Sequence, residues 1–147
     1  MNYKETLDKD FNEHLANVAS ELGFVIYEQY SDETGGALIK LKNEQLRIEL
    51  INDRGIVNLN IGPLTGKENF IDAELINSYL TLQEQESEQL TKWSRKKIVN
   101  KRIDLAEQVN LLTAKRTNLE HIFNKKQVKK TLKDLQQLGE ERFNNML

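Results

Sequence analysis

The stretch NIGPLTGKENF, residues 60–70, contains two glycines followed by a lysine, the residue types of a phosphate-binding loop. Such a loop needs four residues between its glycines, so that backbone amides surround the phosphates, and then Lys followed by Ser or Thr. Here only three residues separate Gly62 from Gly66, and Pro63 has no amide hydrogen to offer. Glu68 stands at the hydroxyl position, where its charge would repel phosphate. The sequence therefore predicts a turn that ends a strand and leads into a helix, and no nucleotide-binding site.

Side chains that could act as acids, bases or metal ligands are scattered along the chain. His14 and His121 are the two histidines, and cysteine is absent, so neither a thiolate ligand nor a local histidine pair is available. Glu84, Glu86 and Glu88 are spaced by two residues, which points them in different directions on a helix. The sequence therefore predicts no catalytic, cofactor-binding or metal-binding residues, and we expect a protein that is not an enzyme.

The charges divide the chain into an acidic front and a basic back. The net charge is −2, but residues 1–91 carry 7 Lys/Arg and 17 Asp/Glu, whereas residues 92–133 carry 13 Lys/Arg and 3 Asp/Glu. Two clusters in the basic part, KWSRKKIVNKR (92–102) and KKQVKK (125–130), contain no acidic residue. Such clusters can neutralise the phosphates of a nucleic acid, dock on an acidic protein, or form a solvated helical face.

The elements that position these residues follow from the hydrophobic period. Residues 2–22 repeat apolar side chains at steps of three and four, which predicts an amphipathic helix. Asn2 followed by Glu5 is a capping-box pattern at its start, and Gly23 suits its C-terminal cap.

After this helix the period changes to two, as in half-buried strands. The alternating stretches are FVIYEQY (24–30), ALIKLK (37–42), QLRIELI (45–51) and IVNLNI (56–61). Their short connections predict a four-stranded antiparallel meander. The sequence NDRG is typical of a tight hairpin in which Gly55 adopts a positive φ. One face of this sheet is apolar, and we expect the first helix to cover it.

The chain from Lys67 to Leu138 contains neither glycine nor proline, and its composition predicts helices. A first apolar stripe, suited to a helix that packs beside the N-terminal one, is formed by Phe70, Ala73, Ile76 and Leu80.

Further along, leucine or isoleucine recurs every seven residues from Ile98 to Leu119, and another stripe runs from Val128 to Leu138. We expect a coiled-coil-like hairpin of two long helices that turns within residues 113–118. In that hairpin the two basic clusters would lie level and form one patch. The alternative is a partner chain that supplies the second stripe, as in a homodimer through the C-terminal helices.

The segment LRIELINDRGIVNLNIGP, followed by ENFIDAELINSYL, resembles small uncharacterised bacterial α/β proteins of the immunity- or defence-associated type. The resemblance covers about residues 5–82, and its specific element is the Asp-Arg-Gly turn between alternating strands. It implies the α-β-β-β-β-α arrangement and a role in protein interaction. Because the turn is structural, the resemblance transfers no functional residue, and the basic C-terminal helices lie outside it.

Together these patterns predict an α+β fold: a helix, a four-stranded meander, a helix, and a long C-terminal helical hairpin. We expect an α-β4-α domain in residues 1–82 and the basic hairpin in residues 83–147. The predicted function is non-catalytic binding of another protein, with a toxin or defence effector as a candidate partner. The alternative is nucleic-acid binding by the basic helices. The chain has no stretch apolar enough to cross a membrane, and we expect it in the cytoplasm.

The predicted partner-binding residues come from the open sheet face and from the two basic clusters. They are Lys40, Arg47, Asn58, Asn60, Trp93, Arg95, Lys96, Lys97, Lys101, Arg102, Lys125, Lys126, Lys129 and Lys130.

Overall fold

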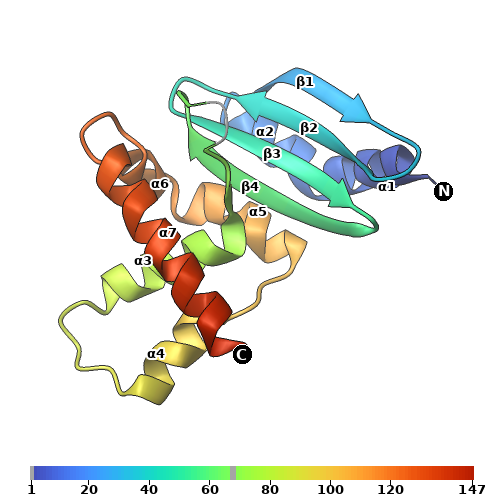
Figure 1. Cartoon of the computed structure of the whole chain (residues 1–147). Helices are drawn as coiled ribbons and strands as arrows, with labels where there is room; N and C mark the ends of the chain where they lie inside the picture. Colours follow the sequence, from blue (N-terminus) through green and yellow to red (C-terminus); the bar gives the residue numbers. More distant parts are fainter. Residues whose placement is uncertain (1, 67–68) are drawn as a thin grey trace.

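The computed structural model describes residues 2–66 and 69–147 (Figure 1). An N-terminal helical segment leads into a five-stranded antiparallel sheet, and helices make up the rest of the chain. The predicted α+β class, the N-terminal helix and the antiparallel sheet are confirmed. The structure differs from the prediction in its fifth strand and in the arrangement of the C-terminal helices.

Three consecutive pieces form the N-terminal helical segment: α1 (Tyr3–Asp10), the π-helical turn η1 (Phe11–Leu15) and α2 (Ala16–Glu21). The Asn2 side chain accepts a hydrogen bond of 2.8 Å from the backbone N–H of Glu5, so the predicted N-cap is present. Gly23 follows α2 with a φ of +75°, a left-handed conformation that favours glycine.

The sheet is a meander in which sequential strands are neighbours. Its strands are β1 (Val25–Ser31), β2 (Gly36–Lys42), β3 (Leu46–Asp53), β4 (Ile56–Pro63) and β5 (Ile71–Asp72), in the order β1-β2-β3-β4-β5. Ile48 lies opposite Leu41 on one side and Ile61 on the other, so the apolar positions of three strands share one face. The four predicted strands are thereby confirmed. β5 has only two residues, too few to produce an alternating pattern.

The turn between β3 and β4 has the predicted hairpin geometry. Gly55 has a φ of +96°, and Arg54 before it has a φ of +54°. The Asn52 side chain accepts a hydrogen bond of 2.8 Å from the N–H of Gly55. Two positive φ values suit the twist of the flanking strands, so this turn fixes the β3–β4 register.

Five helices follow the sheet: α3 (Ala73–Glu84), α4 (Lys92–Val99), α5 (Leu105–Ala114), α6 (Arg116–Ile122) and α7 (Val128–Asn145). The predicted hairpin turn within 113–118 is wrong, because only Lys115 interrupts the helices there. The chain turns back within residues 123–127 instead (Figure 1). The Asn124 side chain stabilises that turn by accepting hydrogen bonds from the N–H groups of Lys126 and Gln127, at 3.0 and 2.9 Å.

Two helical segments cover the apolar sheet face. α1 packs on β2 and β3, while α5 packs on β4 and beside η1 and α2. α5 therefore takes the place beside the N-terminal segment that the sequence assigned to the helix of residues 70–80. α3 packs instead against α4, α5 and α7. One hydrophobic cluster runs through sheet and helices and includes Leu50, Ile76 and Leu135.

The division expected at residue 82 falls inside α3, two residues before its end at Glu84. No helix within the described part of the chain is both long enough and apolar enough to cross a membrane.

Candidate partner-binding surface

The predicted binding residues on the sheet lie on its open face, but their side chains are used inside the molecule. Lys40 Nζ is 3.0 Å from Glu28 Oε2 on β1 and 4.0 Å from Glu49 Oε2 on β3. The hydrogen bond to Glu28 raises the pKa of Lys40. Asn60 donates a hydrogen bond of 2.9 Å to Glu49 Oε1. These side chains form a connected polar ladder across β1 to β4.

Arg47, also on this face, binds the glycine-containing loop that follows β4. Its guanidinium donates to the carbonyl oxygens of Pro63, at 2.7 Å, and of Gly66. It also lies 4.7 Å from the ring centroid of Phe70, a cation–π contact. Phe70 thus precedes α3 and faces the cations of the sheet, and its predicted place in the α3 stripe is wrong. The loop is held through its carbonyls by an internal arginine, an arrangement unlike a phosphate cradle. Residues 67 and 68, at the predicted Lys and hydroxyl positions, lie outside the described residues.

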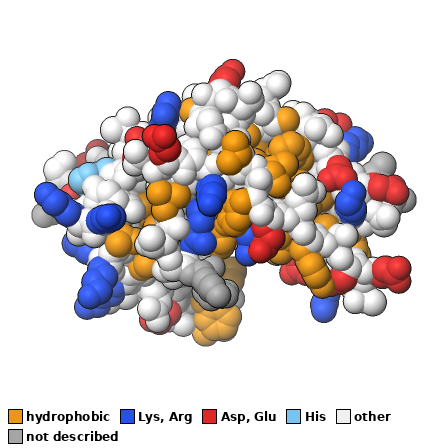
Figure 2. All heavy atoms as spheres, turned by 90° about the horizontal axis from the view of Figure 1, so that it is seen from above, with side chains coloured by type: hydrophobic (Ala, Val, Ile, Leu, Met, Phe, Trp, Pro, Cys, Tyr) orange, Lys and Arg blue, Asp and Glu red, His pale blue; other side chains and the backbone are white. Residues whose placement is uncertain are grey.

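Figure 2 shows the molecule from the side above the sheet in Figure 1. Hydrophobic side chains there are mixed with charged side chains of both signs. Asn58, the remaining predicted sheet residue, accepts a hydrogen bond of 3.3 Å from the Gln108 side chain of α5. The sheet half of the predicted surface therefore offers neither one sign of charge nor side chains free of internal contacts.

The first basic cluster presents a different surface. Thr91 accepts a hydrogen bond of 3.0 Å from the N–H of Ser94 and caps the start of α4. On this helix Lys92 lies four residues before Lys96, and Trp93 lies four residues before Lys97, so the members of each pair are neighbours. These four side chains are exposed and form what we call the α4 face. Trp93 is 66% exposed, and Lys97 Nζ lies 3.8 Å from its ring centroid.

The opposite side of α4 is fixed to the end of α7. Arg95 makes two hydrogen bonds to the carboxylate of Glu141, at 2.8 and 2.9 Å. Asn100, at the end of α4, donates to the carbonyl oxygen of Arg142 at 3.1 Å. α4 is therefore held with Trp93 facing solvent, and Arg95, predicted as a binding residue, has an anchoring role.

The segment after α4 continues the positive charge. Lys101 and Arg102 are exposed, and Arg102 Nε lies 3.6 Å from Glu74 Oε2. The Glu74 side chain is buried and accepts a hydrogen bond of 3.0 Å from the N–H of Ile103. Arg142 also reaches the same oxygen, at 3.4 Å. Glu74 thus joins α3, α7 and residues 101–103, a role that no spacing in the sequence indicates.

The second basic cluster lies at the other end of α7. Lys125 and Lys126 are in the turn before this helix, and Lys129 and Lys130 are in its first turn. Lys130 is paired with Asp134 at 3.0 Å. Glu141, where α4 packs, lies eleven positions after Lys130, roughly 16 Å along a helix. The prediction that both clusters form one patch is therefore wrong, because the turn that would align them lies elsewhere (Figure 1).

A groove of about 430 Å³ lies between α3, α4 and α7. Tyr79 lies in it and donates a hydrogen bond of 3.0 Å to Asp134 Oδ2. Burial, together with this hydrogen bond, raises the pKa of Tyr79 to about 12. The cations of the groove, Arg95 and Lys130, both pair with acids of the groove, so neither is left for an anionic ligand.

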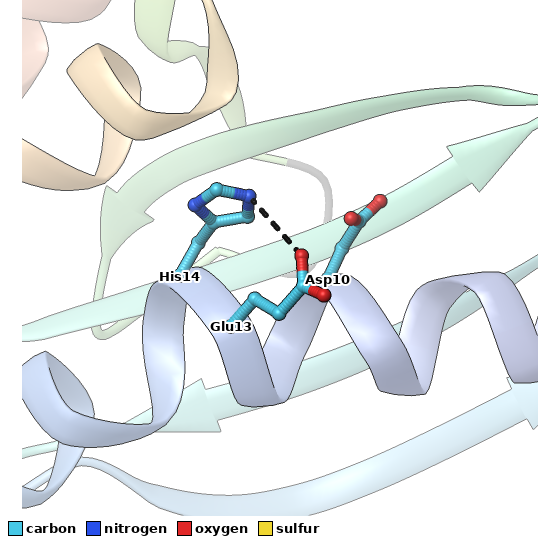
Figure 3. A group of neighbouring side chains, drawn as sticks. All are labelled: Asp10, Glu13 and His14. Atoms are coloured by element: carbon cyan, nitrogen blue, oxygen red, sulfur yellow. Dashed lines mark ion pairs between the residues drawn. The ribbon is translucent and has the colours of Figure 1, made fainter.

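Asp10, Glu13 and His14 form the group of described residues that could hold a metal ion (Figure 3). Their ligand atoms lie within 4.8 Å of one another at the π-helical turn, and His14 Nε2 is 3.9 Å from Glu13 Oε2. Their spacing, i, i+3 and i+4, is a signal that the sequence interpretation did not use. Glu13 and His14 are adjacent in the chain and lie at the surface, so their proximity has a structural explanation. His121 lies on α6, exposed.

Comparisons with protein-family models, with curated proteins and with solved structures found no match to this chain.

Proposed function

We propose that this chain is a non-catalytic binding protein whose partner is another protein, and that an acidic surface of this partner contacts the α4 face. The observation that supports the proposal is the exposed Trp93 among Lys92, Lys96 and Lys97 on a helix anchored from behind by Arg95 and Glu141. Tryptophan is over-represented among residues that dominate binding energy. Surrounding cations would select an acidic partner and accelerate encounter with it.

The lysines in and beside the α4 face are available to an acidic partner. Within residues 2–66 and 69–147, no ion pair involves Lys92, Lys96 or Lys101, in contrast to Arg95 and Lys130. A rigid helix that presents an aromatic side chain also loses little conformational freedom on binding, since its backbone is already ordered.

Nucleic-acid binding is the alternative, and it rested on one continuous basic patch. The separation of the two clusters along α7 removes that support, and the 17 acidic residues of the first 91 would repel a polyanion that extended beyond α4. A role as an immunity- or defence-type protein stays a prediction of the resemblance. Under it, the acidic partner would be a toxin or defence effector.

The proposal is tested by reversing the charge of two lysines on the α4 face and, as a control, of two lysines in the other basic cluster. Tagged wild type is used to capture partners from an extract of the source cells at physiological salt, beside Trp93→Ala and Lys96→Glu/Lys97→Glu. The matched control is Lys125→Glu/Lys126→Glu, from the other basic cluster. We expect at least one acidic protein to be retained by wild type and the control, and lost from both α4 variants.

The alternative, nucleic-acid binding, is tested by a gel-shift titration with duplex and single-stranded oligonucleotides at two salt concentrations. A protein that binds nucleic acid through about five phosphates would show a slope of log affinity against log salt of roughly −4. Tight, salt-sensitive binding by the wild type, together with equal loss in both charge-reversed variants, would contradict the proposal.

A further inference from the structure

The two edges of the sheet differ in whether other elements cover them. On the β4 side, β5 pairs with Asn60 and Ile61, and Gln108 of α5 accepts the next free N–H, that of Leu59, at 2.8 Å. On the other side β1 pairs with β2, and no described strand covers its outer edge. One edge is therefore closed by a strand and a helix, and the other is left open.

The open edge also exposes apolar side chains, three in the first part of β1 and one, Tyr30, in its second part. Val25, Ile26, Tyr27 and Tyr30 of β1 are 60%, 44%, 39% and 57% exposed, four of the ten large hydrophobic side chains exposed among the described residues. Edge strands of monomeric proteins are usually protected by lysine, proline, bulges or short length, because their free backbone groups pair readily with another strand. The sequence of β1, VIYEQYS, has neither lysine nor proline.

A bulge between Ile26 and Glu28 protects the first part of β1, which leaves its second part regular. From Glu28 to Ser31 each residue has one partner on β2. The single charge in this part, Glu28, is held by Lys40 at 3.0 Å, so it is a weak obstacle to a new neighbour.

We propose that β1 is a self-association edge, at which a second copy of this chain adds its own β1 antiparallel and continues the sheet through both molecules. An antiparallel pair of identical strands is related by a two-fold axis perpendicular to the sheet. Residues that face each other across this axis lie on the same face of the sheet, so the axis passes midway between the two copies of one residue.

Charge, together with the end of β1 at Ser31, limits the residues at which the axis can lie. An axis at Glu28 sets two carboxylates directly opposite each other, and an axis at Tyr30 sets Glu28 opposite Asp32, another carboxylate. An axis at Gln29 avoids both. It places Glu28 opposite Tyr30 twice, and it places the two Gln29 amides, which can donate and accept, against each other.

The helix beside this edge is compatible with the arrangement. A small cleft between α1 and the edge is lined by Lys4, Asp8 and Gln29, among other residues. Lys4 and Asp8 form an ion pair of 3.3 Å. The α1 helices of two copies would therefore approach the axis with balanced charges near Gln29.

The axis residue gives a register-specific test in the full chain. Sedimentation equilibrium over a range of concentrations should show a concentration-dependent dimer for the wild type. Gln29→Glu and Gln29→Lys each place like charges on the axis and should raise the dimer dissociation constant about tenfold or more. An equimolar mixture of the two variants should restore dimers, now heterodimers. Gln136→Glu and Gln136→Lys, on an exposed part of α7, should dimerise as the wild type does.

Circular dichroism confirms that each variant is folded. A wild type that is monomeric at every concentration would overturn the proposal. The same result is expected if an extended segment of an unrelated protein, and not a second copy of this chain, occupies the edge. Dimers that persist equally in both Gln29 variants, or a mixture that does not restore them, would place the association elsewhere and overturn it too.

Discussion

Ile48 lies at the centre of the apolar sheet face, between Leu41 on β2 and Ile61 on β4, and is 0% exposed. Alternation in the sequence is sufficient to place it there, since Leu46, Ile48 and Leu50 share one face of a single strand. The side chain therefore contributes burial of apolar surface and close contacts with several neighbours.

We expect Ile48→Ala to lower the free energy of unfolding by about 2–5 kcal/mol, because the removed methyl groups leave a cavity among rigid strands. Chemical denaturation with urea measures the loss. The matched control is Ile56→Ala at the start of β4, where the side chain is 65% exposed and the expected change is within about 0.5 kcal/mol. Equal effects of the two variants would contradict the central position of Ile48.

The same alternation places Lys40 and Arg47 on the outer face but does not reveal their contacts. Arg47 binds carbonyls of a loop 16 and 19 residues away, and Lys40 binds a carboxylate on β1. These contacts depend on how three strands and a loop are aligned, which the pattern of one strand does not contain. The position of the sheet half of the candidate surface is therefore predicted, whereas its internal contacts are not, and its role in binding stays a prediction.

At the scale of elements, the helix boundaries after residue 84 were missed although the sequence carries local signals for them. Two N-caps are visible as pairs of residues spaced by three. The Thr91 side chain accepts the N–H of Ser94, and the Asp104 side chain accepts the N–H of Glu107. Asn124 caps the turn before α7 in a similar way. The lack of glycine and proline, and the seven-residue repeat, favoured uninterrupted helices instead.

The hydrogen bond from Tyr79 to Asp134 joins α3 to α7, and we expect its contribution to stability to depend on pH. Burial and the hydrogen bond to Asp134 raise the pKa of Tyr79 from 10.0 to about 12, so the folded state favours the protonated hydroxyl. Its contribution to stability is therefore fully present below pH 10 and is lost as the pH rises toward about 12.

We expect Tyr79→Phe to lower the free energy of unfolding by about 1 kcal/mol at neutral pH, the net value of one hydrogen bond. The difference from the wild type should shrink between pH 10 and about 12, as measured by urea denaturation at each pH. Tyr27→Phe, on the exposed edge strand, is the control for the removal of a tyrosine hydroxyl at the surface. A Tyr79 difference that stays constant across this range would contradict the assigned role of the hydroxyl.

For the whole molecule, the sequence predicts the elements better than their assembly. The meander and its covering helix follow from local periodicity, but the position of α5 on β4 joins residues about 50 apart along the chain. The division of the chain at residue 82 stays a prediction. The structure adds that the two expected parts share one hydrophobic cluster, which includes Leu59 from the first and Leu112 from the second.

Gln108 is the polar link between these two parts, and it gives the last prediction. Its side chain is buried, accepts the N–H of Leu59 at 2.8 Å and donates to the carbonyl of Ile103 at 3.1 Å. Gln108→Ala would leave the Leu59 N–H buried without an acceptor at the edge of β4. We expect the free energy of unfolding to fall by about 1–3 kcal/mol, the cost of a buried unpaired backbone group.

Asn110→Ala is the matched control, because it also removes an amide side chain from α5, but from an exposed position. Alanine favours helix more than asparagine does, so this variant should be unchanged or slightly more stable. Urea denaturation compares the two variants, and hydrogen exchange at the Leu59 amide tests the mechanism, since that N–H should exchange faster in Gln108→Ala alone. Equal stabilities together with unchanged protection of Leu59 would show that α5 does not close the β4 edge through Gln108.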